Sequence, residues 1–471
     1  MVRNKQRAAL TLAVTVVTNL AAAQAPPPAT SAPLVTPPEV AAYADTARRL
    51  IEAAATTKPT AWDRLAELTD TFGHRLSGSA SLEAALRWGA EQMRADGLEN
   101  VRLEPVMVPR WVRGRESAEL VAPLHGELAL LGLGNSVGTP PEGIEADVAV
   151  VTSFDDLERL GRSGVEGRIV LYDVPYTRYG ETVEYRSSGA SRAAALGARA
   201  VLLRSVGPIG LRTPHTGALR YADDAPRIPA AAVTVEDAQR LRRLHERGQK
   251  PRVRLRMEAR FEADAPSANL VGEIVGRESP HEVVLVGGHI DSWDVGTGAM
   301  DDGAGCVMTW QALALVKRLG LRPRRTLRVV LFTNEENGLR GGLAYRDAHL
   351  AELADHVAAL ESDSGGFRPL GFGFSGGDAA RATVRAVAGL LAPLHATRVK
   401  GEGGGADIGP LARAGGVPTL SLDVDGERYF VYHHTPADTL ERLEPEHLAQ
   451  GAAAVAVMGY VLADLEQRLP R

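Results

Sequence analysis

The sequence predicts an α/β protein with a layered catalytic domain, and three observations support this prediction. From about residue 259 onward, β-rich runs alternate with segments of helical periodicity, the pattern of a sheet covered by helices. The chain has 471 residues, which is too long for one simple core, so we expect two domains. Residues 116–258 differ from the rest in their sequence pattern, which consists of short β-rich runs. This predicts that they form the second domain, inserted into the first.

Composition narrows the class of protein. Hydrophobic residues make up 45% of the chain and charged residues 24%, which is the balance of an ordinary globular protein. The formal net charge of −5 is small for this length and gives no support for nucleic-acid binding. Cys306 is the single cysteine, so no intrachain disulfide can form, and we expect it to pack inside a buried helix.

The N-terminal residues have the features of an export signal. Residues 1–25 begin with Arg3, Lys5 and Arg7 and continue as a mostly apolar run that ends in small residues. A membrane anchor is the alternative, but the run is short and contains Thr and Asn. We therefore expect a secreted or periplasmic protein with no stable membrane insertion. Residues 26–44 are rich in Pro, Ala and Thr and predict a spacer or propeptide.

The first part of the catalytic domain is expected at residues 45–115. Apolar spacing predicts helices over 41–56, 60–72 and 80–96, followed by a strand over 100–109. The inserted domain then covers 116–258. Its short β-rich runs lie at 148–151, 169–172 and 201–203, with a helix of small residues at 193–200. This β-rich unit resembles the protease-associated domain.

The second part of the catalytic domain covers 259–471. Strands are expected over 268–275, 283–287, 326–333, 356–361 and 417–423, and helices over 303–319, 378–391 and 443–468. In open α/β sheets, ligands bind where the strands end. Six residues of types that bind metals follow the predicted strand ends or lie near them. They are His289, Asp301, Glu335, Glu336, Asp363 and His434.

These residue types suit a pair of metal ions. Zinc binds imidazole nitrogen and carboxylate oxygen, and one carboxylate can bridge two ions about 3.5–4 Å apart. We expect Asp301 to bridge, with His289 and Glu336 on one ion and Asp363 and His434 on the other. Adjacent residues point in different directions, so one carboxylate of the Glu335–Glu336 pair can bind metal while the other takes a proton from water. The set predicts a metal-dependent hydrolase.

Two further carboxylates are expected beside the ligands. Asp291 lies two residues after His289 and shares its face of an extended strand. It can therefore accept the second imidazole N–H and fix the tautomer, although a surface pair is the more common explanation of such a motif when it is taken alone. Asp302 lies beside the bridging position, and it also fits an ordinary N-cap for the helix that follows.

Five motifs together carry a family resemblance. They are Gly288–Gly296, Gly298–Gly303, Glu335–Glu336, Glu361–Asp363, and His433–His434 ahead of Asp438–Thr439. With them, nearly all of the chain after residue 25 resembles the di-zinc exopeptidase family that contains zinc aminopeptidases and glutamate carboxypeptidases. The resemblance implies a three-layer α/β/α catalytic domain with a mixed central sheet. It implies zinc ligands and a base as well: His289, Asp301, Glu336, Asp363 and His434 as ligands, with Glu335 as general base.

The resemblance also implies details of the site and the activity. The peptide bond between Asp301 and Asp302 is expected to be cis, and His433 is expected to have a supporting role. The protein would hold two Zn²⁺ per chain, form a homodimer and hydrolyse short peptides, chiefly dipeptides with both termini free. Zinc would lower the pKa of a bound water, from which Glu335 removes the proton. Tyr432 is a candidate donor to the oxyanion.

Two other functions remain open at this point. An aminopeptidase acting on longer peptides would use the same residues, since the loops that separate the two activities cannot be placed from the sequence. A catalytically silent binding protein on the same scaffold is the second alternative. The complete ligand set and the presence of Glu335 argue against it.

Overall fold

The computed structural model describes residues 38–471. The predicted signal peptide at 1–25, and all of the predicted spacer before residue 38, lie outside this range. The remainder of that spacer includes the short helix α1 (Pro38–Ala41). Among the helices of residues 38–471, none has the length and apolar character needed to cross a membrane.

The predicted N-terminal helices are confirmed, and their sequences explain where they begin. They are α2 (Ala44–Thr56), α3 (Ala61–Phe72) and α4 (Ala80–Ala95). The Thr60 side chain accepts the Asp63 backbone N–H, and the Asp63 carboxylate accepts the Thr60 N–H, so a capping box starts α3. Ser79 caps α4 in the same position. The predicted strand follows as β1 (Glu99–Val108).

The main sheet has eight strands in the order β1-β12-β14-β13-β15-β18-β16-β17. The strands after β1 are β12 (Ala265–Ile274), β13 (Ser279–His289), β14 (Arg325–Phe332), β15 (His356–Glu361), β16 (Pro369–Ser375), β17 (Arg398–Lys400) and β18 (Thr419–Val424). The central strands β14, β13, β15 and β18 are parallel, whereas β1, β12 and β16 run antiparallel to their neighbours β12, β14 and β18. The prediction of a mixed sheet is therefore confirmed.

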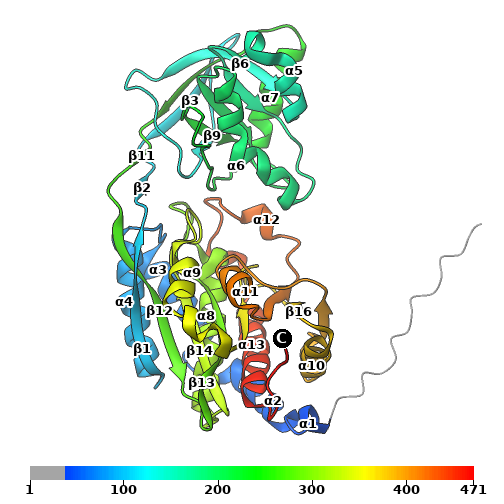
Figure 1. Cartoon of the computed structure of the whole chain (residues 1–471). Helices are drawn as coiled ribbons and strands as arrows, with labels where there is room; N and C mark the ends of the chain where they lie inside the picture. The colour runs from blue at the N-terminus through cyan, green and yellow to red at the C-terminus, as the bar shows by residue number, and fades with distance from the viewer. Residues whose placement is uncertain (1–37) are drawn as a thin grey trace, which may run out of the picture. The chain divides into compact units, whose positions relative to one another are not determined.

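Both faces of this sheet are covered (Figure 1). Val284 and Val286 of β13 pack into one hydrophobic cluster, and Val283 and Leu285 of the same strand pack into another on the opposite face. Strands buried on both faces read as continuous apolar runs. The first face carries α4, α8 (Ala304–Arg318), α10 (Asp378–Gly389) and α13 (Pro445–Asp464); the second carries α9 (Arg340–Ala348) and α11 (Gly409–Gly415). The predicted three-layer α/β/α fold is confirmed.

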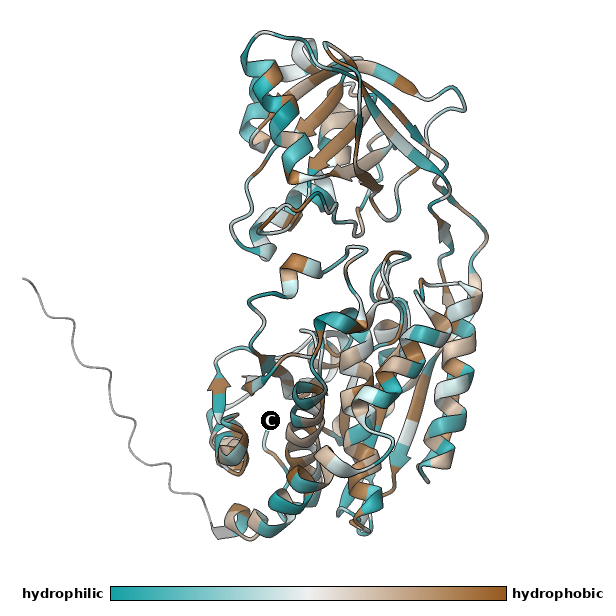
Figure 2. Ribbon diagram, turned by 180° about the vertical axis from the view of Figure 1, so that it is seen from behind, coloured by the Kyte–Doolittle hydropathy of each residue, from teal (hydrophilic) through white to brown (hydrophobic). Residues whose placement is uncertain are grey.

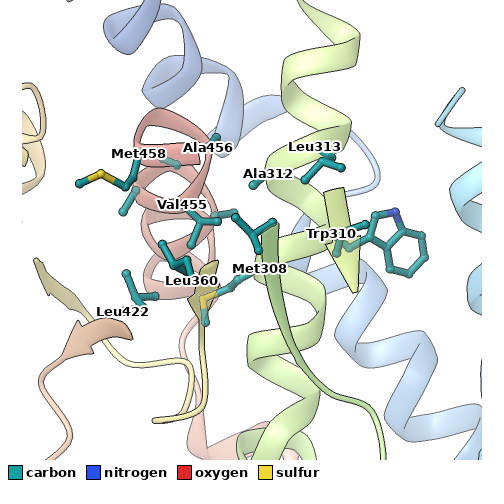
Figure 3. Packing of buried hydrophobic residues seen from close by; sticks show 14 of the residues in the cluster. Met308, Trp310, Ala312, Leu313, Leu360, Leu422, Val455, Ala456 and Met458 are labelled. Carbon is teal, nitrogen blue, oxygen red and sulfur yellow. The ribbon is translucent and has the colours of Figure 1, made fainter. Parts of the chain in front are cut away.

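The larger cluster is built around α8 and α13, which are buried on nearly all sides. Met308 of α8 and Val455 of α13 meet Leu360 and Leu422 from the sheet (Figure 3). Figure 2 shows where hydrophobic and hydrophilic residues lie, with hydrophobic brown in the strands and hydrophilic teal on outward helix faces. Cys306 is buried in α8, as predicted.

The second sheet takes all its strands from residues 116–257. In sequence they are β3 (Glu116–Ala122), β4 (Gly126–Leu128), β5 (Leu130–Gly132), β6 (Ile144–Val151), β7 (Ile169–Tyr172), β8 (Ala200–Arg204), β9 (Ala230–Val233) and β10 (Arg252–Met257). The chain enters and leaves this region through two short strands, β2 (Trp111–Val112) and β11 (Arg260–Phe261), which pair with each other. Whether this region is a protease-associated domain with boundaries at 116 and 258 stays a prediction.

Three helices accompany the second sheet: α5 (Phe154–Val165), α6 (Tyr179–Ala195) and α7 (Val235–Glu246). The sequence-based expectation of a helix over 193–200 is wrong. Those residues include the end of α6 and the turn before β8, because Gly197 adopts a positive φ of 87° that ends the helix. The first part of α6 was missed, since its mixture of Gly, Thr and Ser gives weak helical periodicity.

Candidate metal centre

The central strands bring the predicted ligands to one end of the main sheet. His289 is the last residue of β13, and Asp363 follows β15, its neighbour on one side. Glu336 follows β14, its neighbour on the other side. Asp301 lies in the turn Ala299–Gly303 that leads into α8. His434 arrives from farther along the chain, directly after α12 (Tyr429–Tyr432) and His433.

The distances divide these residues into two groups that share Asp301. His289 Nε2 lies 3.3 Å from Asp301 Oδ1 and 3.5 Å from Asp363 Oδ1. On the other side, His434 Nε2 lies 3.2 Å from Asp301 Oδ2 and 3.0 Å from Glu336 Oε2. Each oxygen of the Asp301 carboxylate therefore faces a different imidazole. This is the arrangement that a bridging carboxylate requires.

The shortest contacts differ from the predicted allotment of ligands to two ions, but the allotment stays a prediction, because ligand atoms of His289, Asp301 and Glu336 also lie within 4.8 Å of one another. The sequence-based allotment placed His289 with Glu336, whereas the shortest contacts pair His289 with Asp363 and His434 with Glu336. Both Glu336 and Asp363 follow strands that flank β13, so sequence order could not decide between them. The loop after β14 begins at Asn334 with a positive φ of 62°, and it carries Glu336 toward His434.

Unpartnered polar atoms test whether metal ions fit this set. Within residues 38–471, the buried atoms Asp301 Oδ2 and Glu336 Oε1 have no hydrogen-bond partner. Buried carboxylate oxygens are normally satisfied by a donor or a metal. Three sets of candidate ligand atoms lie within 4.8 Å of one another: Asp301 with His433 and His434, His289 with Asp301 and Glu336, and His289 with Asp302 and Asp363. The nitrogen and oxygen donors fit zinc.

The pKa values reflect the crowding of like charges. Burial raises the pKa of Glu336 to about 7, and the nearby Asp301 carboxylate adds to this effect. Burial also raises the pKa of Glu335 well above its usual range, although His289 opposes the shift. Burial lowers the pKa of His434, but Glu336 and Asp301 more than offset this and bring it to about 10. The carboxylates thus need positive charge close by, which a divalent cation supplies.

The expected role of Asp291 is corrected in part. His289 Nδ1 lies 3.0 Å from the backbone oxygen of Asp291, while the Asp291 carboxylate is 3.8 Å away. The carbonyl, and not the carboxylate, therefore fixes the tautomer of His289. The Asp291 carboxylate instead accepts the backbone N–H groups of Glu335 at 3.0 Å and Glu336 at 3.3 Å. It thereby holds the loop that carries both glutamates.

Asp302 supports both His289 and the start of α8, although the N-cap residue of α8 is Gly303 and not Asp302. Its Oδ1 accepts the Gly305 N–H at 3.1 Å at the start of α8, and its Oδ2 accepts the His289 N–H at 3.1 Å. The peptide bond between Asp301 and Asp302 is cis, as the family resemblance implies. Asp438 supports the same turn, because its two oxygens accept the N–H groups of Met300 at 2.7 Å and Asp301 at 3.2 Å.

Glu335 faces a cavity of about 880 Å³ together with Asp301, Glu336, Asp363 and His434. His433 also reaches this cavity: its ring stacks on that of His434 with centroids 3.5 Å apart, and its Nε2 lies 3.5 Å from Asp301 Oδ2. The candidate oxyanion donor Tyr432 is not among the residues that line this cavity. Its ring packs against Arg442, whose guanidinium carbon lies 5.1 Å from the ring centre.

Several residues of the site were not found from the sequence. Arg75 donates to the backbone oxygens of Ile290 at 2.8 Å and Gly298 at 2.9 Å, and so supports the loop between His289 and Asp301. Tyr179 and Arg186 of α6 line the cavity from the side of the second sheet. No local motif marks these residues, because they reach the site only through long-range packing.

Comparison with known proteins agrees with this geometry. The model of peptidase family M28 matches residues 269–458. Carboxypeptidase Q from Homo sapiens is 47% identical over 92% of each chain, and the Bos taurus enzyme is 48% identical over the same share. Within the family, the five sequence motifs resemble those of carboxypeptidase Q in particular, and the full-length identity to these relatives confirms that resemblance.

Solved structures extend the comparison to the fold. A peptidase M28 precursor from Shewanella amazonensis aligns with a TM-score of 0.88 and 34% identity, covering 92% of this chain and 99% of that chain. A zinc aminopeptidase from Bacillus subtilis aligns with a TM-score of 0.65 and 20% identity, covering 87% and 96%, which shows a shared fold. Identity across nearly the full length, with a donor set that suits metal ions, shows that this chain is a metallopeptidase and belongs to peptidase family M28.

Proposed function

We propose that this chain is an exported di-zinc exopeptidase that hydrolyses short peptides, chiefly dipeptides with both termini free. One observation carries the proposal. The carboxylate of Asp301 lies between two donor pairs, His289 with Asp363 and His434 with Glu336. This is a donor set for two ions sharing one bridge. The full-length similarity to carboxypeptidase Q supports a peptidase of the carboxypeptidase type.

The five ligands would hold two Zn²⁺, which supply Lewis acidity for the scissile carbonyl and lower the pKa of the attacking water. Glu335 acts as the general base. Glu335 lines the cavity, and Asp291 accepts its backbone N–H at 3.0 Å, so the loop that carries Glu335 is held beside the candidate ligands. Glu335 takes the proton of the water and then delivers it to the leaving amine.

The surroundings of the centre support short substrates. The cavity of about 880 Å³ takes its lining both from the ends of the main sheet and from α6 of the second sheet. Walls on two sides favour a ligand enclosed over much of its surface. The insertion of residues 116–258 as a separate domain, the homodimer and the export of the chain are part of the same proposal.

Four matched substrates test this function on the purified chain supplied with zinc. They are a free dipeptide, its N-acetyl form, its C-terminal amide and a longer peptide with the same first two residues. We expect hydrolysis of the free dipeptide alone, at a rate that falls when zinc is removed by a chelator. Zinc content measured on the same sample should be two ions per chain.

The other outcomes are equally informative. Cleavage of the amide and the longer peptide, but not of the acetylated dipeptide, would establish an aminopeptidase in place of a dipeptidase. No cleavage of any substrate with two zinc ions bound would favour a binding protein on this scaffold. Fewer than two ions per chain, with full activity, would contradict the bridging role of Asp301.

A further inference from the structure

His434 differs from the other candidate ligands in how it is held. It lies in a loop beyond α12, and its backbone has a positive φ of 61°, a conformation that non-glycine residues adopt at a cost. Such a backbone is kept only where its surroundings fix it. The backbone contact that fixes it comes from Thr216, in the segment between β8 and β9 of the second sheet. On the imidazole, Nδ1 also lies 3.3 Å from Arg186 Nη1 of α6.

Thr216 holds His434 at two points. Its backbone N–H donates to the His434 carbonyl oxygen at 2.9 Å. Its own carbonyl oxygen lies 3.3 Å from His434 Nδ1. A proton on Nδ1 shared with this carbonyl leaves the lone pair of Nε2 free, directed at Asp301 and Glu336. Metal-binding histidines are commonly oriented by such a carbonyl.

Thr216 is itself anchored by its side chain. The hydroxyl donates to the Gly132 carbonyl oxygen at 2.7 Å and lies 3.3 Å from Arg113 Nη2 as an acceptor. Arg113 is in turn fixed by Asp294, with Nη2 2.6 Å from Oδ1. Thr216 is fully buried, so water does not replace these bonds. The hydroxyl therefore fixes the position of the peptide group that contacts His434.

Gly217 shows how closely this segment approaches the ligand. A Cβ added there would lie 2.7 Å from His434 Nδ1 and 2.3 Å from Arg186 Nη1, closer than real atoms pack. The residue also has a positive φ of 126°. Only glycine fits both conditions, and its lack of a side chain is what lets the backbone reach the imidazole.

We propose that Thr216 is a positioning residue for the metal ligand His434, and that the segment carrying it completes the half of the centre formed by His434 and Glu336. The inference rests on the proposed function, because it takes His434 as a ligand. It adds that a region without predicted ligands sets the metal affinity of the site. The main-sheet domain alone would then hold one ion well and the other weakly.

The test compares three threonine variants of the full chain. Thr216→Val removes the hydroxyl at constant shape, and Thr216→Ser keeps it. Thr213→Val is the matched control, since the Thr213 hydroxyl donates only to Leu211 O at 3.1 Å in the same segment. Zinc dissociation constants are measured by chelator competition, and the absorption spectrum of the Co²⁺-substituted protein reports the ligand geometry.

We expect Thr216→Val to raise the dissociation constant of one of the two zinc ions by about tenfold or more. The absorption spectrum of the cobalt-substituted variant should also change. Thr216→Ser and Thr213→Val should match the parent protein. Equal zinc affinity and an unchanged spectrum in Thr216→Val would overturn the inference. Should that variant not fold, Gly217→Ala decides in its place, because its methyl group would push against both Arg186 and the His434 imidazole.

Failure of the proposed function has a different signature. In that case the parent protein itself would bind fewer than two zinc ions, or would cleave none of the four substrates. If the parent binds two ions and Thr216→Val binds both equally well, only the role of Thr216 is refuted.

Discussion

At the scale of single residues, the centre depends on carboxylates that use both oxygens. Asp301 directs one oxygen to His289 and the other to His434. Asp291 divides its oxygens between the N–H groups of Glu335 and Glu336. Because each oxygen has its own partner, loss of one carboxylate disturbs two contacts at once. Substitutions at these positions therefore have specific and separable effects.

Glu335→Gln should keep the zinc and lose the activity. The change removes the base but keeps the size of the side chain, and Glu335 is not assigned as a ligand. We expect kcat to fall by about 10²- to 10⁴-fold, the usual contribution of a general acid–base, with two zinc ions still bound. The measurement is kcat on a free dipeptide together with metal content. A near-normal kcat would remove Glu335 from this role.

Asp301→Ala should lose metal as well as activity. The substitution removes the single carboxylate that faces both imidazoles, so neither ion retains its shared ligand. Metal content after dialysis is the readout, with Asp425→Ala as the control. The Asp425 carboxylate forms an exposed ion pair with Arg368 at 2.9 Å, and this pair does not involve a candidate ligand. Retention of two zinc ions by Asp301→Ala would refute the bridging assignment.

At the scale of elements, close packing of α8 against the strand ends positions the ligands. A Cβ added at Gly305 would lie 1.8 Å from the backbone oxygen of Ser362 and 2.3 Å from Asp302 Oδ1. Gly288 is similarly restricted, with Asp302 Oδ2 2.3 Å from its added Cβ. The glycines let the helix start approach β13 and β15, so that Asp302 can reach the His289 N–H.

Gly305→Ala should therefore destabilise the chain even without metal. The methyl group forces α8 away from Ser362, and overpacking of this kind costs about 1–3 kcal/mol. Urea unfolding of the metal-free protein measures the effect. Gly180→Ala is the control, because an added Cβ near the start of α6 meets nothing within 4 Å. There we expect no loss, and equal stability of the two variants would contradict the packing argument.

At the scale of the whole molecule, a second buried polar cluster lies where β15 begins. His356 is the first residue of β15, while the candidate ligand Asp363 follows the end of the strand. The His356 Nε2 atom contacts the Tyr345 hydroxyl at 3.0 Å, and the His356 Nδ1 atom contacts the Glu352 carbonyl oxygen at 3.0 Å. Burial lowers the pKa of His356 from 6.5 to about 4. The folded chain therefore keeps this imidazole neutral across mildly acidic pH.

This shift makes stability depend on pH with a defined sign. Below about pH 6.5, His356 binds a proton in the unfolded chain, whereas in the folded chain it stays neutral until about pH 4. The His356 contribution is thus complete above pH 6.5 and is lost as the pH falls toward 4, amounting to roughly 3 kcal/mol. His356→Gln should flatten this part of the stability profile in metal-free protein. An unchanged slope between pH 7 and 4 would refute it.

Most of the local structure could be predicted from the sequence. The central strands were located because residues such as Val284 and Val330 form apolar runs buried on both faces. The helices α3 and α4 were located from the helical spacing of their apolar residues, and the structure adds that Thr60 and Ser79 cap them. The helix α6 was missed, since its start has weak apolar periodicity and is supported by packing.

The sequence by itself determined the family, the layered fold and the set of candidate ligands, because these depend on local periodicity and on motifs of a few residues. The tertiary structure decided which candidate ligands make the shortest contacts on either side of Asp301, and it turned the Asp291 carboxylate toward the glutamate loop. It also brought Thr216 to His434, which lies 218 positions along the chain. Contacts of this kind follow from strand order and from the packing of distant segments, which no local pattern encodes.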